Sequence, residues 1–427
     1  MAKVLIHSLL FAPDSVSDAY LYTDLARELM KLGHEVTVLT TTPHYNVLPE
    51  VIEAQPLRPR CGTWLLESEV DGITVFHVRV PPKKPGVSTR TKTALRFHAL
   101  STWWALRGMN RHDIVISPSP PLSIGVVSWA LGRIWRVPSV YLVQDVFPDG
   151  LILDGKITNK WIIRGLRALE RFVYNRNTAV VVIAESFAKV LRPTMRSPES
   201  LKQIPNFVDE QVYRPLPRDN EFTRKYGLTD RFVVSYAGNI GNGQDFSPVM
   251  EAAKQCGDLP ITFVIVGDGI KKAALETEVS NARLENVIIL GYQPRSLVPY
   301  INAGSDLCAV LLDKHVQGFG FPSKIYTIMA CGKPPIVWAP NGSDLATIIS
   351  ESNCGRFVNV GNTSAFVSAV RNAYEERLEL PIEGERGRQF VTERYTKKVV
   401  AAKYDAMIRE LTQSGVVPDR TALENST

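Results

Sequence analysis

The sequence is poor in cysteine and in long apolar runs. Its five cysteines are dispersed and form no CxxC pair, which argues against a disulfide framework and a structural zinc site and favours a reducing cytoplasm. No stretch reaches the ~18 uninterrupted apolar residues that a membrane-spanning helix needs. The N-terminal run "MAKVLIHSLLFAPD" is broken by His7 and ended by Pro13, so it predicts a buried strand rather than a signal peptide.

Two common phosphate-binding patterns, GxGxxG and GxxxxGK[ST], are also missing. Acidic residues are absent from 83–112, where seven Lys and Arg residues stand. A second basic row has helical spacing and consists of Lys160, Arg164, Arg167 and Arg171. Local positive potential of this kind attracts anionic lipid or nucleic acid.

What the chain does contain is a repeated alternation of apolar β-rich runs and helical patterns. With 427 residues, two domains are expected, and the alternation predicts an α/β fold with parallel sheets covered on both faces. We expect a Rossmann-like domain at 1–210, a second one at 211–395 and a C-terminal helix at 396–413 that crosses back to the first domain. The polar tail 414–427 is expected to be disordered.

The segment Gly318–Pro335, "GFGFPSKIYTIMACGKPP", predicts an anion site. Ser323 and Lys324 stand directly before a predicted short helix, Ile325 to Cys331. Free N–H groups and the positive end of the helix dipole favour negative charge at such a position. On sequence alone, Lys324 could equally be a solvated lysine.

Two further polar loops follow predicted strands of the same domain. "YAGNIGNGQD" spans Tyr236–Asp245, and "GYQPRS" spans Gly291–Ser296. Ligands of open α/β sheets lie beyond the carboxyl ends of the strands. The three loops are therefore expected to line one site, although Asn239 and Gln244 could simply shape a turn.

Several phrases, in this order and across nearly the whole chain, resemble the retaining glycosyltransferases of family 4, two-domain enzymes of the GT-B type. They are "LARELMKLGHEVTVLT", "IPNFVD", "YAGNIG", "VIVGDG", "SDLCAVLL" and "MACGKPPIV". "QDVFPD" and "PSK" further resemble the branch that builds bacterial O-antigen, capsule and exopolysaccharide on lipid carriers.

The resemblance implies that the C-terminal domain binds a nucleotide-sugar, most simply a UDP-sugar, and that Lys324 meets the diphosphate. Thr327 stands where the family commonly has the second of two glutamates, and Asn239 and Gln244 stand where Arg and Lys are frequent. The phosphate charge would therefore rest mainly on Lys324. The implied donor-binding residues are Gly238, Asn239, Gly241, Gln244, Tyr292, Gln293, Ser323, Lys324 and Thr327.

The same resemblance places the acceptor in the N-terminal domain. Asp145 is the expected polar group near the reacting hydroxyl, and with Lys324 it makes up the expected catalytic pair. Ser15, Ser17, Asp18 and His44 are the expected residues of the acceptor side. Asp18 could instead cap a helix, and Asp145 could merely cap a turn. The implied chemistry is front-face displacement with retention, and neither a cofactor nor a metal is expected.

The stretch "TALRFHALSTWWALRGM" predicts a basic helix with aromatic neighbours. Arg96, Trp103, Trp104 and Arg107 are expected to contact a membrane interface. An ordinary domain helix with tryptophan in the core is the alternative.

Taken together, these patterns predict an enzyme of the inner membrane surface, cytoplasmic and peripheral. It would move a sugar from a nucleotide-diphosphate donor to a lipid-linked (polyprenyl diphosphate) saccharide in surface polysaccharide biosynthesis, such as that of lipopolysaccharide, without binding nucleic acid. Two alternatives stay open: a nucleotide-sugar epimerase of the same fold, and a non-catalytic basic protein that binds membranes or nucleic acid.

Overall fold

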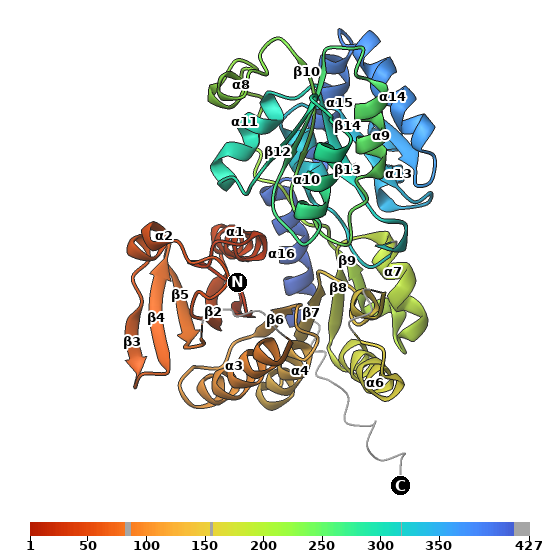
Figure 1. Cartoon of the computed structure of the whole chain (residues 1–427). Helices are drawn as coiled ribbons and strands as arrows, with labels where there is room; N and C mark the ends of the chain where they lie inside the picture. Colours follow the sequence, from red (N-terminus) through yellow and green to blue (C-terminus); the bar gives the residue numbers. More distant parts are fainter. Residues whose placement is uncertain (82–86, 154–156, 317, 414–427) are drawn as a thin grey trace. The chain divides into compact units, whose positions relative to one another are not determined.

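The computed structural model describes residues 1–81, 87–153, 157–316 and 318–413 (Figure 1). The chain divides into two compact units, Met1–Asn206 with Lys397–Thr427, and Phe207–Thr396. The C-terminal helix α16 (Lys397–Gln413) belongs to the first unit, where it packs on α1 (Ser17–Lys31). The tail 414–427, expected to be disordered, lies outside the described residues, as do Lys83 and Lys84 of the basic stretch.

The first unit is built on a nine-stranded sheet in the order β3-β4-β5-β2-β1-β6-β7-β8-β9. Its strands are β1 (Lys3–His7), β2 (Glu35–Thr41), β3 (Arg58–Cys61), β4 (Leu65–Val70), β5 (Ile73–Val78), β6 (Ile114–Pro118), β7 (Ser139–Val143), β8 (Ala179–Val182) and β9 (Leu201–Gln203). Its other helices are α2 (Pro49–Ala54), α3 (Val87–Arg107), α4 (Ile124–Trp135), α5 (Asp149–Leu153), α6 (Lys160–Arg176) and α7 (Glu185–Leu191), with 3₁₀ turns at Arg192–Thr194 and Pro198–Ser200.

The edge of this sheet departs from the predicted βα repetition. β3, β4 and β5 form an antiparallel run, in which β4 and β5 are joined by the two residues Asp71 and Gly72. Both residues have positive φ, 51° and 79°, as a tight hairpin turn requires, and Asp-Gly is a favoured pair for it. The remaining neighbours pair in parallel.

The second unit is a six-stranded, fully parallel sheet in the order β12-β11-β10-β13-β14-β15. Its strands are β10 (Phe232–Ala237), β11 (Ile261–Val266), β12 (Val287–Leu290), β13 (Leu307–Leu311), β14 (Pro335–Ala339) and β15 (Arg356–Asn359). Its helices are α8 (Glu221–Lys225), α9 (Ser247–Gln255), α10 (Lys272–Asn281), α11 (Val298–Ala303), α12 (Lys324–Ala330), α13 (Asp344–Ser352), α14 (Thr363–Glu375) and α15 (Leu380–Arg394), with 3₁₀ turns at Arg295–Leu297 and Lys314–Val316.

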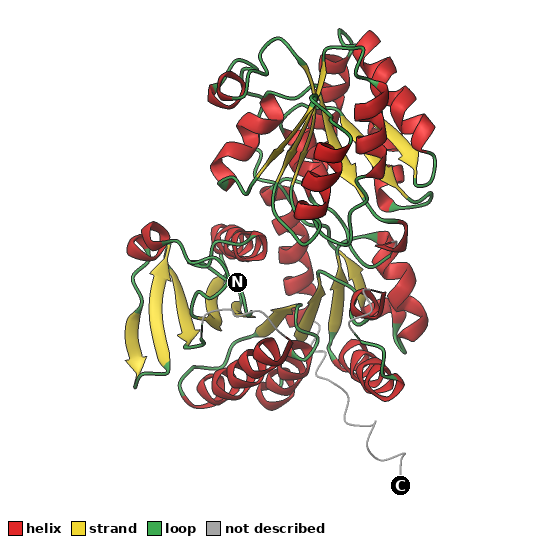
Figure 2. Ribbon diagram, viewed as in Figure 1, coloured by secondary structure: helices red, strands yellow, loops and turns green. Residues whose placement is uncertain are grey.

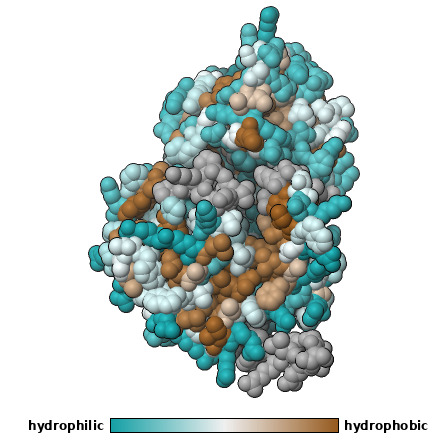
Figure 3. Space-filling view, turned by 60° about the horizontal axis from the view of Figure 1, so that its bottom comes forward, coloured by the Kyte–Doolittle hydropathy of each residue, from teal (hydrophilic) through white to brown (hydrophobic). Residues whose placement is uncertain are grey.

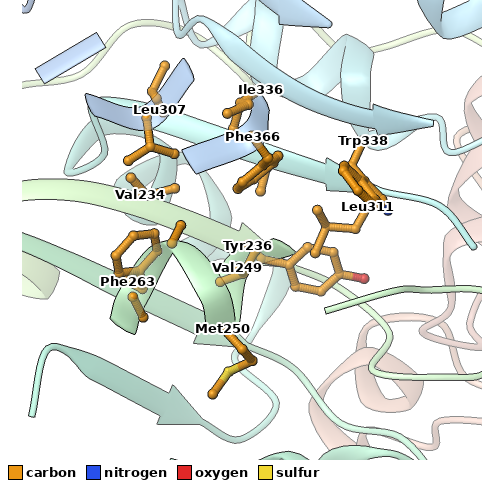
Figure 4. Packing of buried hydrophobic residues seen from close by; sticks show 14 of the residues in the cluster. Val234, Tyr236, Val249, Met250, Phe263, Leu307, Leu311, Ile336, Trp338 and Phe366 are labelled. Atoms are coloured by element: carbon orange, nitrogen blue, oxygen red, sulfur yellow. The ribbon is translucent and has the colours of Figure 1, made fainter. Parts of the chain in front are cut away.

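Helices cover both faces of this sheet, so its strands are largely apolar, apart from the edge strand β15 (Figure 2). Every residue of β11, β13 and β14 is buried. On one face, Met250 of α9 and Phe366 of α14 pack with strand residues such as Phe263 and Trp338 (Figure 4). The predicted two-domain α/β architecture with parallel sheets is confirmed. Among the described residues, no helix is both long enough and apolar enough to cross a membrane.

Candidate functional site

The second unit has a topological switch between β10 and β13. These strands are neighbours, but from β10 the chain continues outward to β11 and β12, and from β13 it continues the other way to β14 and β15. The loops after β10 and β13 therefore diverge, and crevices of this kind hold ligands in open α/β sheets. The Asp313 N–H donates to the carbonyl of Gly243 at 2.9 Å, which ties the two loops together.

Glycines hold the loop after β10 against the loop after β11. The Gly238 N–H donates to Val266 O at 2.9 Å, and the Ile240 N–H donates to Asp268 O at 2.8 Å. A Cβ at Gly267 would stand 1.8 Å from the Gly238 carbonyl oxygen, and one at Gly269 would stand 2.2 Å from that of Ile240. Only glycine permits this backbone-to-backbone approach.

Lys324 lies at this crevice, with its ammonium over an aromatic ring. Its Nζ stands 3.8 Å from the ring centroid of Tyr236, a cation–π contact, and the Tyr236 hydroxyl donates to Asn239 O at 2.5 Å. Among the described residues Lys324 has no hydrogen-bond or ion-pair partner for its ammonium. Burial without a partner lowers the pKa of Lys324 to about 7. An anion placed here would gain a strong interaction and would restore the charge.

The start of α12 offers fewer free N–H groups than expected. The N–H groups of Ile325 and Tyr326 donate to Pro322 O at 3.2 Å and Ser323 O at 3.0 Å. Within the described part of the chain, the N–H groups of Ser323 and Lys324 have no acceptor. The expectation that the N–H groups following Lys324 are free is therefore wrong for these first two residues. The Thr327 hydroxyl donates to Lys324 O at 2.8 Å, back into its own helix.

Asn239 and Gln244 shape the loop after β10 from within. The Gln244 Oε1 accepts from the Gly241 N–H at 3.1 Å and from Asn239 Nδ2 at 3.5 Å. Lys271, which the sequence did not single out, donates to the Gln244 carbonyl at 2.8 Å. Asn239 is exposed and Gln244 is half-buried, so their remaining polar groups can still reach a ligand.

Tyr292 and Gln293 follow β12 at the same carboxyl edge of the sheet. β11 separates β12 from β10, so this loop lies two strands away from the switch. Tyr292 is 63% exposed, and the Gln293 amide donates to Gly291 O at 3.4 Å. The loop can offer an aromatic ring and polar groups at the outer side of the crevice.

The first unit has its own switch between β1 and β6, and the loop after β1 together with the start of α1 carries three carboxyl or hydroxyl candidates. Ser15 is buried and its hydroxyl has no partner among the described residues. Ser17 is exposed at the first turn of α1. The residue that caps α1 is Val16, so Asp18 is not the N-cap, the alternative that its residue type allowed.

Asp18 and Asp145 interact through their charges. Burial, and then the negative charge of Asp145, raise the pKa of Asp18 to about 6. Asp145 is exposed to solvent, yet the protein around it still raises its pKa through desolvation. Carboxyl groups with raised pKa values are frequent at sites that exchange protons. The structure thus brings together two residues chosen separately from the sequence.

His44 is placed differently. Its side chain is buried, and its Nδ1 lies 3.0 Å from Thr41 Oγ1, so the ring is not open to a ligand in this structure. The buried carboxylate of Asp14, which sequence reasoning missed, accepts from the N–H groups of His44, Tyr45 and Asn46 at 2.9–3.0 Å. Asp14 therefore fixes the loop after β2 to the loop after β1. No local pattern announces this long-range contact.

Helix α3 also differs in part from expectation. Arg96, Trp103 and Arg107 are exposed, but Trp104 is only 8% exposed and packs edge-on against Phe76, with ring centroids 5.5 Å apart. The expected membrane contact of Trp104 is therefore wrong, since the core takes up its ring. Among the described residues, no group of three His, Cys, Asp or Glu side chains could hold a metal ion.

Two protein-family models match the chain, one in each of its two units. The family model for the glycosyl transferase 4-like domain matches residues 20–206, and that for glycosyl transferases group 1 matches residues 231–376. WbjE of Pseudomonas aeruginosa, named a glycosyltransferase, is 28% identical over 70% of this chain and 75% of its own. WcaI of Escherichia coli K12, named a colanic acid biosynthesis glycosyl transferase, is 24% identical over 95% of this chain and all of its own.

Solved structures show the same fold. HepE of Anabaena in complex with UDP-glucose superposes with a TM-score of 0.71 at 16% identity, over 96% of this chain and 100% of HepE. WaaG, a glycosyltransferase involved in lipopolysaccharide biosynthesis, gives a TM-score of 0.67 at 13% identity, over 96% of this chain and 99% of its own.

Proposed function

Because the chain is a glycosyltransferase of the GT-B fold, with a glycosyl transferase 4-like domain and a group 1 domain, we propose that it transfers a sugar from a nucleotide-diphosphate donor to a lipid-linked saccharide in bacterial surface polysaccharide biosynthesis. The observation that carries the donor assignment is the ammonium of Lys324, held over Tyr236 at the switch between β10 and β13 and without an ion-pair partner among the described residues. A diphosphate would supply the negative charge that pairs with this ammonium.

The donor is proposed to be a UDP-sugar. HepE, which shares the fold, has been crystallised with UDP-glucose. In this chain the diphosphate would lie against Lys324 Nζ and the N–H groups of Ser323 and Lys324. Gly238 and Gly241 would let the loop after β10 approach the sugar phosphate, and the exposed ring of Tyr292 would lie nearer the base.

We propose a retaining, front-face displacement. The bond between the anomeric carbon and the diphosphate oxygen breaks, and the charge that develops on the diphosphate is stabilised by Lys324. The acceptor hydroxyl attacks the same face, and its proton passes to a departing phosphate oxygen. Asp145 orients that hydroxyl, with Asp18 beside it. Charge neutralisation is assigned to Lys324 rather than to a divalent cation, so turnover should survive EDTA.

The acceptor is proposed to be a saccharide on a polyprenyl diphosphate, presented at the inner face of the cell membrane. The support comes from the curated relatives, because WcaI is named for colanic acid biosynthesis. An acceptor of that kind keeps its lipid in the bilayer, and a transferase that acts on it must work at the membrane surface.

A thermal-shift panel of UDP-, GDP-, ADP- and dTDP-sugars tests the donor assignment, because a ligand that binds only the folded state raises the Tm. We expect the largest shift with a UDP-sugar and little shift for Lys324→Ala. Loss of Lys324 should lower kcat/KM by about 10²–10³-fold. Near-normal turnover of Lys324→Ala would contradict the assignment.

A further inference from the structure

Three helices of the first unit lie side by side on one face of its sheet. α3 packs on α4, and α4 packs on α6, and the three form a row at the bottom of Figure 1. Figure 3 turns this side forward and shows hydrophobic residues gathered across the middle of the face, bordered by hydrophilic ones.

The outward sides of these helices carry large apolar residues. Trp161 at the start of α6 is 79% exposed, a high value for the largest apolar side chain, and Ile162 beside it is also exposed. Single exposed apolar residues need no explanation, but a group of them on one face marks an interaction surface. The exposed large apolar residues of the row are Leu95, Trp103, Leu106, Ile134, Trp161 and Ile162.

The charge on the same helices is almost entirely positive. Their sequences contain ten Lys and Arg residues and a single acidic residue, Glu170. Glu170 is buried and paired with Arg167, so it does not reduce the positive charge of the surface. Arg167 also binds Asp149, which removes it from the basic row expected along α6. Arg164 and Arg171 are exposed and form no ion pair with any described residue.

We propose that this face, made by α3, α4 and α6, docks the protein on an anionic lipid bilayer, with Trp161 and Ile162 inserted at the interface. Amphipathic surfaces with Trp and Leu among Lys and Arg bind in this way, because the apolar side chains enter the headgroup boundary and the cations meet anionic lipid. A nucleic-acid partner would not use the aliphatic side chains, and a protein partner would need complementary acidic groups around an apolar centre.

The inference rests on the proposed function for its purpose, since a lipid-linked acceptor requires the enzyme at the membrane. The proposed membrane contact therefore excludes the buried Trp104 of α3 and includes the exposed residues of α6. The physical observation does not depend on the donor site, which lies in the other unit.

The test is flotation of the full chain with phosphatidylcholine vesicles, with and without phosphatidylglycerol, in the absence of donor and acceptor. We expect binding to the anionic vesicles only, weakened by salt. Arg164→Ala should weaken it about fivefold, since each basic residue near the surface contributes a factor of that order. Trp161→Ser should weaken it about tenfold.

Two matched variants control for unspecific effects. Leu378→Ser removes an apolar side chain that is 85% exposed in the second unit, and Arg58→Ala removes an exposed charge on the edge strand β3. Both should bind as the unchanged protein does. If Trp161→Ser lowers the Tm, Ile162→Ser replaces it.

Equal binding to neutral vesicles, or anionic binding that neither Arg164→Ala nor the apolar variant weakens, would overturn the proposal. An absence of binding to the anionic vesicles would overturn it as well. None of these results changes the donor thermal shift, so failure of the docking face and failure of the donor assignment can be told apart.

Discussion

Donor binding is expected to weaken as the pH rises from 6 to 8, because Lys324 must carry a proton to meet the diphosphate. In the free protein, burial lowers the pKa of Lys324 to about 7. A bound diphosphate raises that pKa again, since it places negative charge beside the ammonium. Binding above the free-protein pKa therefore takes up a proton, and binding well below it does not.

The magnitude follows from that pKa. About 90% of the lysine is protonated at pH 6 and about 10% at pH 8, so the Kd for a UDP-sugar should rise about tenfold between them. The uptake should be close to ~0.9 proton per donor at pH 8 and ~0.1 at pH 6. A nucleotide-sugar is the better probe than UDP, because its diphosphate has no proton to lose near neutrality.

Isothermal titration calorimetry in buffers of different ionisation enthalpy measures both quantities. Lys324→Met should bind weakly at every pH and take up no proton. Lys333→Met is the matched control. Lys333 precedes β14 and so lies at the amino ends of the strands, away from the loops that follow them, and burial also lowers the pKa of Lys333. Its proton uptake should equal that of the unchanged protein. A Kd independent of pH, or uptake lost in Lys333→Met, would refute the reasoning.

Three other perturbations have defined outcomes. Gly267→Ala should destabilise the second unit by about 2–4 kcal/mol, since its Cβ would stand 1.8 Å from a carbonyl oxygen at a φ of 151°; Gly257→Ala, whose Cβ has 3.8 Å of clearance, should unfold at nearly the unchanged Tm. Asp14→Ala leaves three N–H groups without their acceptor and should cost roughly 3 kcal/mol in chemical denaturation; an unchanged midpoint would contradict the role of Asp14. Burial and Asp145 raise the pKa of Asp18 to about 6. The folded state of the protein is therefore stabilised while Asp18 is protonated, and this stabilisation is lost as the pH rises through about 6. Asp18→Asn should therefore raise the Tm at pH 8 and leave it unchanged at pH 4, while the opposite order would show that the carboxylate is stabilised.

Much of the fold could be predicted from local pattern. Buried parallel strands are largely apolar, and helices are periodic, so the βα alternation predicted the parallel parts of both sheets and placed the helix after Lys324 within one residue of α12. The antiparallel run β3–β5 was missed, although Asp71 and Gly72 between apolar runs are a hairpin signal.

The site was predictable where a residue type suits one chemistry and obscure where three-dimensional contacts decide. Lys324 follows from its place before a helix, but its lowered pKa depends on burial over Tyr236. Asp14 holds a loop some thirty residues away, which no local pattern encodes. Trp104 shares a helical stripe with the buried residues Phe97 and Ser101, so the periodicity of α3 could have separated it from the exposed Trp103.

A crystal structure of the protein with a UDP-sugar tests the central claim most directly. The diphosphate is expected at the switch between β10 and β13, with one of its oxygens about 3 Å from the nitrogen of Lys324. Nucleotide density at another place, with that lysine still resting on the Tyr236 ring and no phosphate beside it, would contradict the account.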